Sequence, residues 1–135
     1  MNDGPLLSAI VIFLGGGLGS VLRFFISLWI GQRFGETFPV GTIAVNVTGC
    51  FIIGFLAIIF GTEGRLMVHP LTRMFFLIGI LGGFTTFSSF SLQTLMLARD
   101  QQWLAALGNV LLSVVLCLIG VWLGYVAGDA VNRWR

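Results

Sequence analysis

The sequence predicts an all-α membrane protein with four transmembrane helices, because its composition is strongly apolar and its long apolar runs carry almost no charge. Of 135 residues, 57% are hydrophobic and 9% are charged, whereas soluble domains carry about 25% charged residues. A helix that spans a bilayer needs about 20 mostly apolar residues. Three runs meet this length without a charged residue, and Arg23 alone interrupts a fourth. The expected spans of this single transmembrane domain, residues 1–135, are 5–30, 39–61, 71–98 and 103–128.

The distribution of charged residues excludes several classes of protein. All seven cations are arginines and they form no cluster, so the sequence indicates no nucleic-acid partner. The expected spans contain no Asp, Glu or His, whereas proton-coupled transporters usually need a titratable group within the membrane. An intramembrane hydrolase would also need a base beside its nucleophile. We therefore expect neither an enzyme nor a proton-coupled pump.

The orientation of the chain in the membrane is weakly encoded. Arginines divide four to two between the side of the N-terminus and the opposite side: Arg65, Arg73, Arg133 and Arg135 against Arg33 and Arg99. Such a chain can insert both ways, which allows two copies to pack antiparallel. Since four helices can hardly enclose a solvated path alone, we expect an oligomer.

The first span combines closely spaced glycines with one charged residue. Gly15, Gly19 and Arg23 recur every four residues and share a helix face. Small residues at this spacing allow helix backbones to approach closely, so the glycines predict packing. Arg23 has two interpretations. It reaches out to the membrane interface, or it faces inward and gives an aqueous vestibule a positive potential that favours anions.

The second span carries a small, polar stripe. Thr42, Asn46 and Gly49 follow at helical spacing and share one face. Asn46 also has two interpretations. It makes an interhelical hydrogen bond, or it presents an amide donor to a solute.

The third span contains the feature around which the other helices are expected to gather. Gly82–Thr86 combines poor helix formers, which predicts a break in the middle of the membrane. Irregular backbone survives there only when it is buried in protein or lines a wet cavity. Its freed carbonyls would offer hard oxygen ligands to a small cation. Beyond the break, Phe87 and Phe90 share a face, and their ring edges attract an anion weakly. Ser88 adds a hydroxyl nearby.

The fourth span presents Asn109, Ser113 and Cys117 at four-residue spacing. Ser113 either bonds back to the carbonyl of Asn109 or extends a polar line past the phenylalanines. Glycines at the same spacing near the end of the span predict helix packing: Gly120, Gly124 and Gly128. Uncharged donors can replace part of an anion's hydration shell without trapping the ion, so the four spans together suggest a passive pore that prefers anions.

Three motifs, in this order and over essentially the full length, resemble the Fluc (CrcB-type) bacterial fluoride channels: Gly16-x-x-Gly19-x-x-x-Arg23, Gly41-Thr42-x-x-x-Asn46-x-x-Gly49 and Gly79-x-x-Gly82-Gly83-Phe84-Thr85-Thr86-Phe87-Ser88-Ser89-Phe90. The resemblance implies an antiparallel, dual-topology homodimer in the bacterial inner membrane, with two pores through which fluoride passively leaves the cytoplasm. It also implies a structural Na⁺ at the centre of the dimer, held by the main-chain carbonyls of Gly82 and Thr85.

The candidate roles combine this resemblance with the residue patterns of the four spans. The expected fluoride-pore residues are Asn46, Phe87, Ser88, Phe90 and Ser113, and the expected vestibule residues are Arg23 and Thr42. Two other hypotheses stand beside the channel. A small dual-topology coupled exporter of cationic compounds would have a similar size and four spans, but it would need a carboxylate in the membrane. A non-conducting assembly subunit would use the same glycine-rich faces for packing.

Overall fold

A computed structural model describes residues 4–35, 37–61 and 64–134, and the regular elements of these residues are all helices. Four stretches are long and apolar enough to cross a membrane: Pro5–Phe34, Val40–Ile59, Pro70–Arg99 and Trp103–Arg133. The first, second and fourth are the helices α1, α2 and α6. The third consists of α3 (Pro70–Arg73), the π-helix η1 (Met74–Ile80), α4 (Leu81–Phe84) and α5 (Phe87–Arg99). The protein is therefore an all-helical, multi-pass membrane protein.

The helix ends differ from the expected spans. Helix α1 continues to Phe34 and α6 to Arg133, beyond the expected ends at 30 and 128. A helix keeps its backbone hydrogen bonds when it leaves an apolar run, so it need not stop there. Helix α1 begins with Pro5, whose missing N–H would be unpaired at this position anyway. It ends at Gly35, whose φ of 80° is left-handed and suits glycine.

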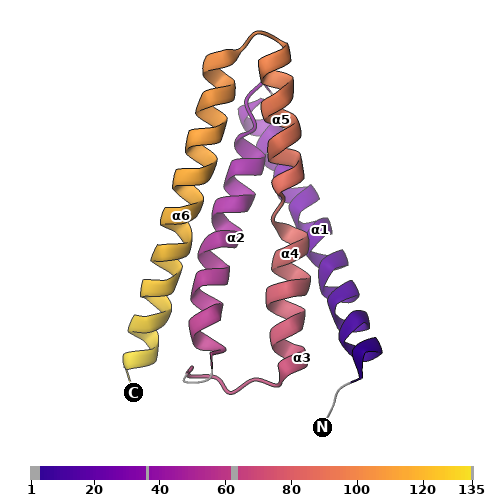
Figure 1. Ribbon diagram of the computed structural model, residues 1–135, viewed down its shortest axis with the longest axis vertical. Helices are drawn as coiled ribbons and strands as arrows, with labels where there is room; N and C mark the ends of the chain where they lie inside the picture. Colours follow the sequence, from indigo (N-terminus) through magenta and orange to yellow (C-terminus); the bar gives the residue numbers. More distant parts are fainter. Residues whose placement is uncertain (1–3, 36, 62–63, 135) are drawn as a thin grey trace.

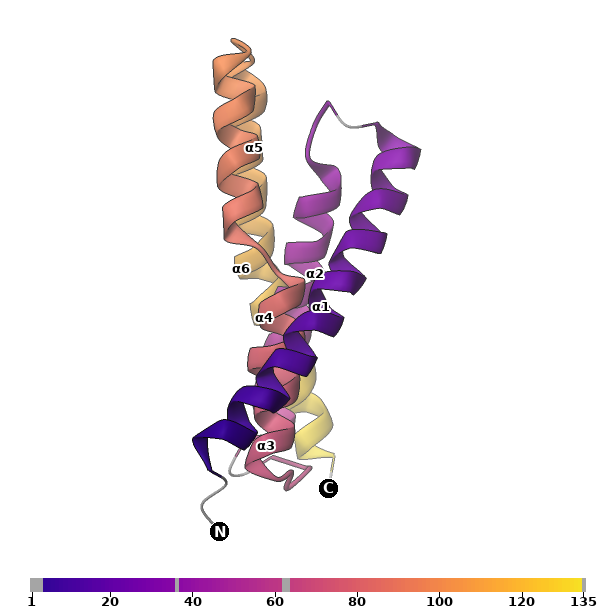
Figure 2. The same cartoon turned by 90° about the vertical axis from the view of Figure 1, so that its right-hand side faces the viewer.

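The four stretches alternate in direction. Both ends of the chain and α3 lie at one end of the molecule, and the short connection between α5 and α6 lies at the other (Figure 1). In the second view, α5 and the first part of α6 lean away from the connection between α1 and α2 (Figure 2). The divergence begins where α4 gives way to α5. Helix α6 therefore packs on α5 near its start and on α2 further along.

Glycines bring the helix pairs into contact. A Cβ at Gly15 of α1 would lie 2.7 Å from the carbonyl oxygen of Phe75 in η1. A Cβ at Gly124 of α6 would overlap the carbonyl oxygen of Phe51 in α2. Both separations are too short for a real side chain, so the helices can approach this closely only where the side chain is a hydrogen atom. The predicted packing role of these glycines is confirmed.

The π-helix η1 is a feature that sequence reasoning missed. The N–H of Leu81 donates to the carbonyl of Phe76, five residues earlier rather than four. Gly79 of η1 lies against Gly15 of α1, since a Cβ on Gly79 would stand 3.0 Å from the Gly15 Cα. The wider turn changes which residues of α4 share a face with those of α3.

The regular backbone is interrupted between α4 and α5. Thr85 and Thr86 are extended, with φ and ψ of −83° and 153° and of −149° and 117°. This interruption is shorter than the expected window of Gly82–Thr86, because Gly82 and Gly83 remain within α4. Gly83 instead packs against α1, where an added Cβ would meet the backbone of Gly16. The expectation that the glycines start the break was therefore wrong.

Large apolar side chains cover the outside of the described chain. Phe13 is 78% exposed, Leu104 87% and Trp122 62%. A monomeric soluble protein rarely exposes apolar surface on this scale. These side chains suit contact with lipid or with another copy of the chain.

Candidate functional site

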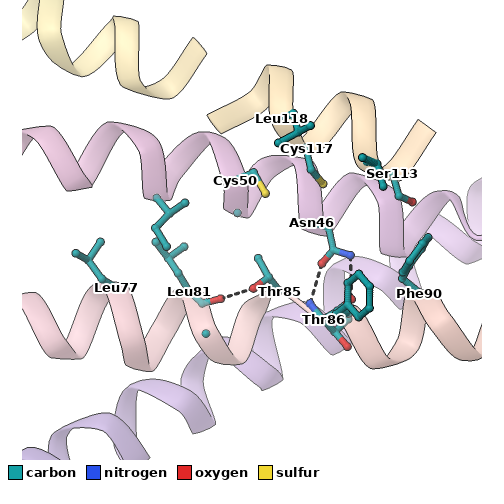
Figure 3. Close-up of a pocket in the computed structure, with 15 residues that line it drawn as sticks. Asn46, Cys50, Leu77, Leu81, Thr85, Thr86, Phe90, Ser113, Cys117 and Leu118 are labelled. Carbon is teal, nitrogen blue, oxygen red and sulfur yellow. Dashed lines mark hydrogen bonds between the residues drawn. The ribbon is translucent and has the colours of Figure 1, made fainter. Parts of the chain in front are cut away.

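A cavity of about 410 Å³ opens beside the interruption, between α2, the third stretch and α6. Figure 3 shows side chains from all three converging on it. Its lining includes six of the predicted site residues: Asn46, Gly82, Thr85, Phe87, Phe90 and Ser113. Residues far apart in sequence are thus brought to one wall.

The carboxamide of Asn46 holds the interruption from the side of α2. Its Nδ2 donates to the carbonyl of Thr86 at 3.0 Å, and its Oδ1 accepts the N–H of Thr86 at 2.7 Å. Both residues are buried. The interhelical interpretation of Asn46 is therefore confirmed. Because Nδ2 carries two N–H groups and this pairing uses one, a second donor remains on the side chain.

These side-chain bonds divert the N–H groups that a continuous helix would direct to its own carbonyls. In a regular helix the N–H of Thr86 would donate to the carbonyl of Gly82, but here it donates to Asn46. The N–H of Ser89 would likewise reach the carbonyl of Thr85, but it donates to the Thr86 hydroxyl at 3.2 Å and so caps α5. The carbonyls of Gly82 and Thr85 thereby lose their helical partners.

The hydroxyl of Thr85 is already engaged. It donates to the carbonyl of Leu81 at 2.9 Å, and the Thr85 N–H donates to the same oxygen at 3.0 Å. Among the residues that the structure describes, no group of three or more His, Cys, Asp or Glu side chains could hold a metal. The carbonyls of Gly82 and Thr85 are thus oxygens at this interruption whose helical donors are engaged elsewhere.

The two predicted aromatic residues form a contacting pair at the start of α5. The ring centroids of Phe87 and Phe90 lie 5.1 Å apart, and the ring planes are inclined at 54°. Phe90 is only 8% exposed, whereas Phe87 is 77% exposed. The pair therefore spans from the interior of one chain to its outer surface.

A chain of hydrogen bonds reaches the cavity from α6. The Ser113 hydroxyl donates to Oδ1 of Asn109 at 3.3 Å, and Nδ2 of Asn109 donates to the Thr94 hydroxyl at 2.8 Å. The Thr94 hydroxyl donates in turn to the carbonyl of Phe90. Ser113 bonds to the side chain of Asn109, so of the two interpretations of Ser113 the back-bond to the main-chain carbonyl is not the one that the structure shows. Asn109 is 1% exposed and links α5 to α6.

A second hollow of about 420 Å³ meets the other side of Thr86. Arg23 and Thr42, the two predicted vestibule residues, both line it, together with Ser89 and Gln93. Arg23 is half-buried there. Of the described polar atoms in this hollow, Oε1 of Gln93 is buried without a hydrogen-bond partner. The structure thus brings the vestibule candidates together next to the interruption.

Ser88 is the predicted pore residue that the structure leaves outside. Among the described residues it lines neither hollow, and it is exposed. Its hydroxyl lies 3.2 Å from that of Thr86, within hydrogen-bond distance. Thr86, which sequence reasoning did not select, is the residue that both hollows share. Its position as a threonine directly before a resumed helix is a capping signal that could have identified it.

Comparison with known proteins gives consistent matches. The model of the family described as CrcB-like protein, Camphor Resistance (CrcB), matches residues 10–125. A protein of Opitutus terrae named fluoride-specific ion channel FluC is 57% identical over 124 residues, which cover 92% of this chain and 94% of that protein. Proteins of the same name from Methylocella silvestris and Rhodospirillum rubrum are each 48% identical, and the matches cover 92% and 94% of this chain and 95% and 98% of those proteins.

Proposed function

The chain belongs to the CrcB-like family, and from this premise we propose that it is a passive, fluoride-selective ion channel that lets fluoride leave the bacterial cytoplasm. The observation that carries the proposal is the cavity at the Thr85–Thr86 interruption, whose wall offers uncharged donors and aromatic edges. Relatives named as fluoride-specific ion channels cover nearly the whole chain.

The chemistry of the wall suits a permeating anion. The second N–H of Asn46 can donate to an anion, and the edges of Phe87 and Phe90 carry partial positive charge. The Ser113 hydroxyl, which donates to Oδ1 of Asn109, can donate to an anion instead when it turns from that oxygen. None of these groups carries a full charge, so an ion that enters can also leave. Arg23 in the adjoining hollow raises the local concentration of anions.

The pore requires a second copy of the chain, packed antiparallel to the first. Phe87 lines the cavity but is 77% exposed in a single chain, so one chain leaves the wall incomplete on this side. Two antiparallel copies would form two equivalent pores, one beside each interruption. The divided arginines and the many exposed apolar side chains support this arrangement.

A structural Na⁺ between the two interruptions is the second part of the proposal. The residues fit the ion, because the carbonyls of Gly82 and Thr85 have lost their helical donors and oxygen is the ligand that hard cations prefer. Two copies would supply four such oxygens. When bound, the ion would hold the two interruptions together. The channel would occupy the inner membrane of a bacterium.

The test is ion efflux from sealed liposomes that contain the purified full-length chain. We expect rapid fluoride efflux, negligible chloride efflux and no dependence on a proton gradient. Equal efflux of both anions would contradict selectivity, and efflux that requires a proton gradient would indicate a coupled exporter instead.

A further inference from the structure

Two cysteines face each other across the contact between α2 and α6. Cys50 of α2 and Cys117 of α6 are both unpaired, and both line the cavity beside the interruption. Figure 3 shows both sulfur atoms directed into the cavity from the same wall, opposite Leu81 and Thr85.

The packing of the helices explains why both thiols lie on one cavity wall. Gly120 lies about one turn beyond Cys117, and a Cβ built on it would stand 3.7 Å from the Cβ of Cys50. The same Cβ would stand 3.1 Å from the carbonyl oxygen of Val47. The glycine thus brings the backbones of α2 and α6 close together, and the two cysteines occupy facing positions on them. Both are only partly buried, so a solute in the cavity can reach them.

We propose that Cys50 and Cys117 form a site for one thiophilic metal ion, bound linearly between the two sulfur atoms. Thiolate is a soft ligand and selects soft metals such as Cu⁺ and its heavier relatives. For a divalent ion such as Hg²⁺, two S–H bonds break, two protons leave to solvent and two metal–sulfur bonds form. No electron is transferred. The product carries no net charge, which suits a site within an apolar bundle.

The residues around the two cysteines also determine which metal ions the site does not bind. Zinc sites in proteins use four ligands, commonly Cys, His or carboxylate. No third Cys, His, Asp or Glu joins the pair in the described part of the chain. An ion that is satisfied by two ligands is therefore bound, and Zn²⁺ is not.

A bound ion would also alter permeation, and this consequence rests on the proposed channel function. The pair shares its cavity with Asn46, Phe90 and Ser113. A heavy metal ion on this wall fills part of the space beside those donors. We therefore expect it to block fluoride efflux.

The binding test uses intact-mass measurement on the purified full-length chain with Hg²⁺. We expect one ion per chain with the loss of two protons, and no retained Zn²⁺. Cys50→Ser and Cys117→Ser should each weaken Hg²⁺ binding about 100-fold or more. Once one thiolate holds the ion, the second thiolate binds it within the same chain, and each variant loses this intramolecular bond. Serine is nearly the size of cysteine, so the fold should survive, which helicity measured by circular dichroism checks. Single variants that bind as tightly as the natural chain, or a species lighter by two hydrogens with no metal, would overturn the site.

The efflux test compares each variant with itself, with and without Hg²⁺. Fluoride efflux through the natural chain should fall at least about tenfold, because the bound ion raises the barrier to permeation. It should recover when a dithiol chelator removes the ion. The double Cys→Ser variant should show no change on adding Hg²⁺. Equal inhibition of the natural chain and the double variant by Hg²⁺ would overturn the site. A natural chain without fluoride efflux would contradict the proposed function, and the mass measurement would still decide the metal site.

Discussion

Asn46 makes both hydrogen bonds of its pairing with the backbone of Thr86, at 3.0 Å to the carbonyl and 2.7 Å from the N–H. A side chain of α2 therefore accepts the N–H that a continuous helix would direct to the Gly82 carbonyl, in a segment 40 residues away. The interruption is held by this pairing and by the Thr86 cap, and the carbonyls of Gly82 and Thr85 become available as a result. One residue thus connects the polar stripe of α2 to the proposed cation site.

Asn46→Ala should destabilise the fold by about 1–3 kcal/mol, because it leaves the buried N–H of Thr86 without its partner and removes one hydrogen bond to the Thr86 carbonyl. Thermal unfolding in detergent measures the loss. Thr48→Ala, on an exposed part of the same helix, is the matched control and should change stability little. Equal effects of the two substitutions would show that the pairing contributes nothing specific.

Phe87→Ile and Phe90→Ile should each lower fluoride efflux about tenfold or more, since an aliphatic side chain has no electropositive edge and a loss of roughly 1.4 kcal/mol in the pore gives that factor. The proposed dimer should remain intact by size-exclusion chromatography. Phe13→Ile on the exposed face of α1 is the control, with efflux unchanged. Unchanged fluoride efflux in both α5 variants would show that the two aromatic rings have no role in permeation.

Thr85→Ala should leave Na⁺ binding unchanged, because the substitution removes only the hydroxyl and retains the main-chain carbonyl. It should lower the stability by about 1 kcal/mol, because the hydrogen bond from the Thr85 hydroxyl to the Leu81 carbonyl is lost. The measurement is the rise in unfolding temperature on adding Na⁺, compared with a bulky organic cation. Loss of the Na⁺-dependent rise would implicate the hydroxyl as a ligand.

Gly124→Ala should destabilise the chain by about 1–3 kcal/mol, because the added methyl group would overlap the Phe51 carbonyl and push α2 from α6. Gly108→Ala is the control on the same helix, since a Cβ there meets nothing within 4 Å of the described chain. It should be neutral or stabilise by up to about 1 kcal/mol, the gain of alanine over glycine in a helix. Unfolding midpoints of the two variants decide between these outcomes.

The four apolar stretches and the packing glycines could be predicted from sequence because both depend on local pattern: the length of an apolar run, and small residues every four positions. The interruption was only partly predictable. Glycine propensity pointed to Gly82, but the tertiary contact with Gly16 holds Gly83 within the helix, and the chain departs from helix at the threonines.

The remaining differences arise from contacts between helices. The bond from Asn109 to Thr94 depends on how α5 and α6 face each other, which spacing along α6 does not reveal. Ser88 shares a motif with Phe87, but the rotation of α5 about its axis turns it away from the cavity. The π-turn of η1 has no signature in residue type.

The most direct test of the central claim is the reversal potential across a planar bilayer that contains the purified chain and separates two fluoride concentrations, with chloride equal on both sides. A passive fluoride-selective pore predicts a steady current that reverses at the equilibrium potential of fluoride. Reversal at zero, or the absence of any current while fluoride is exchanged, would contradict it.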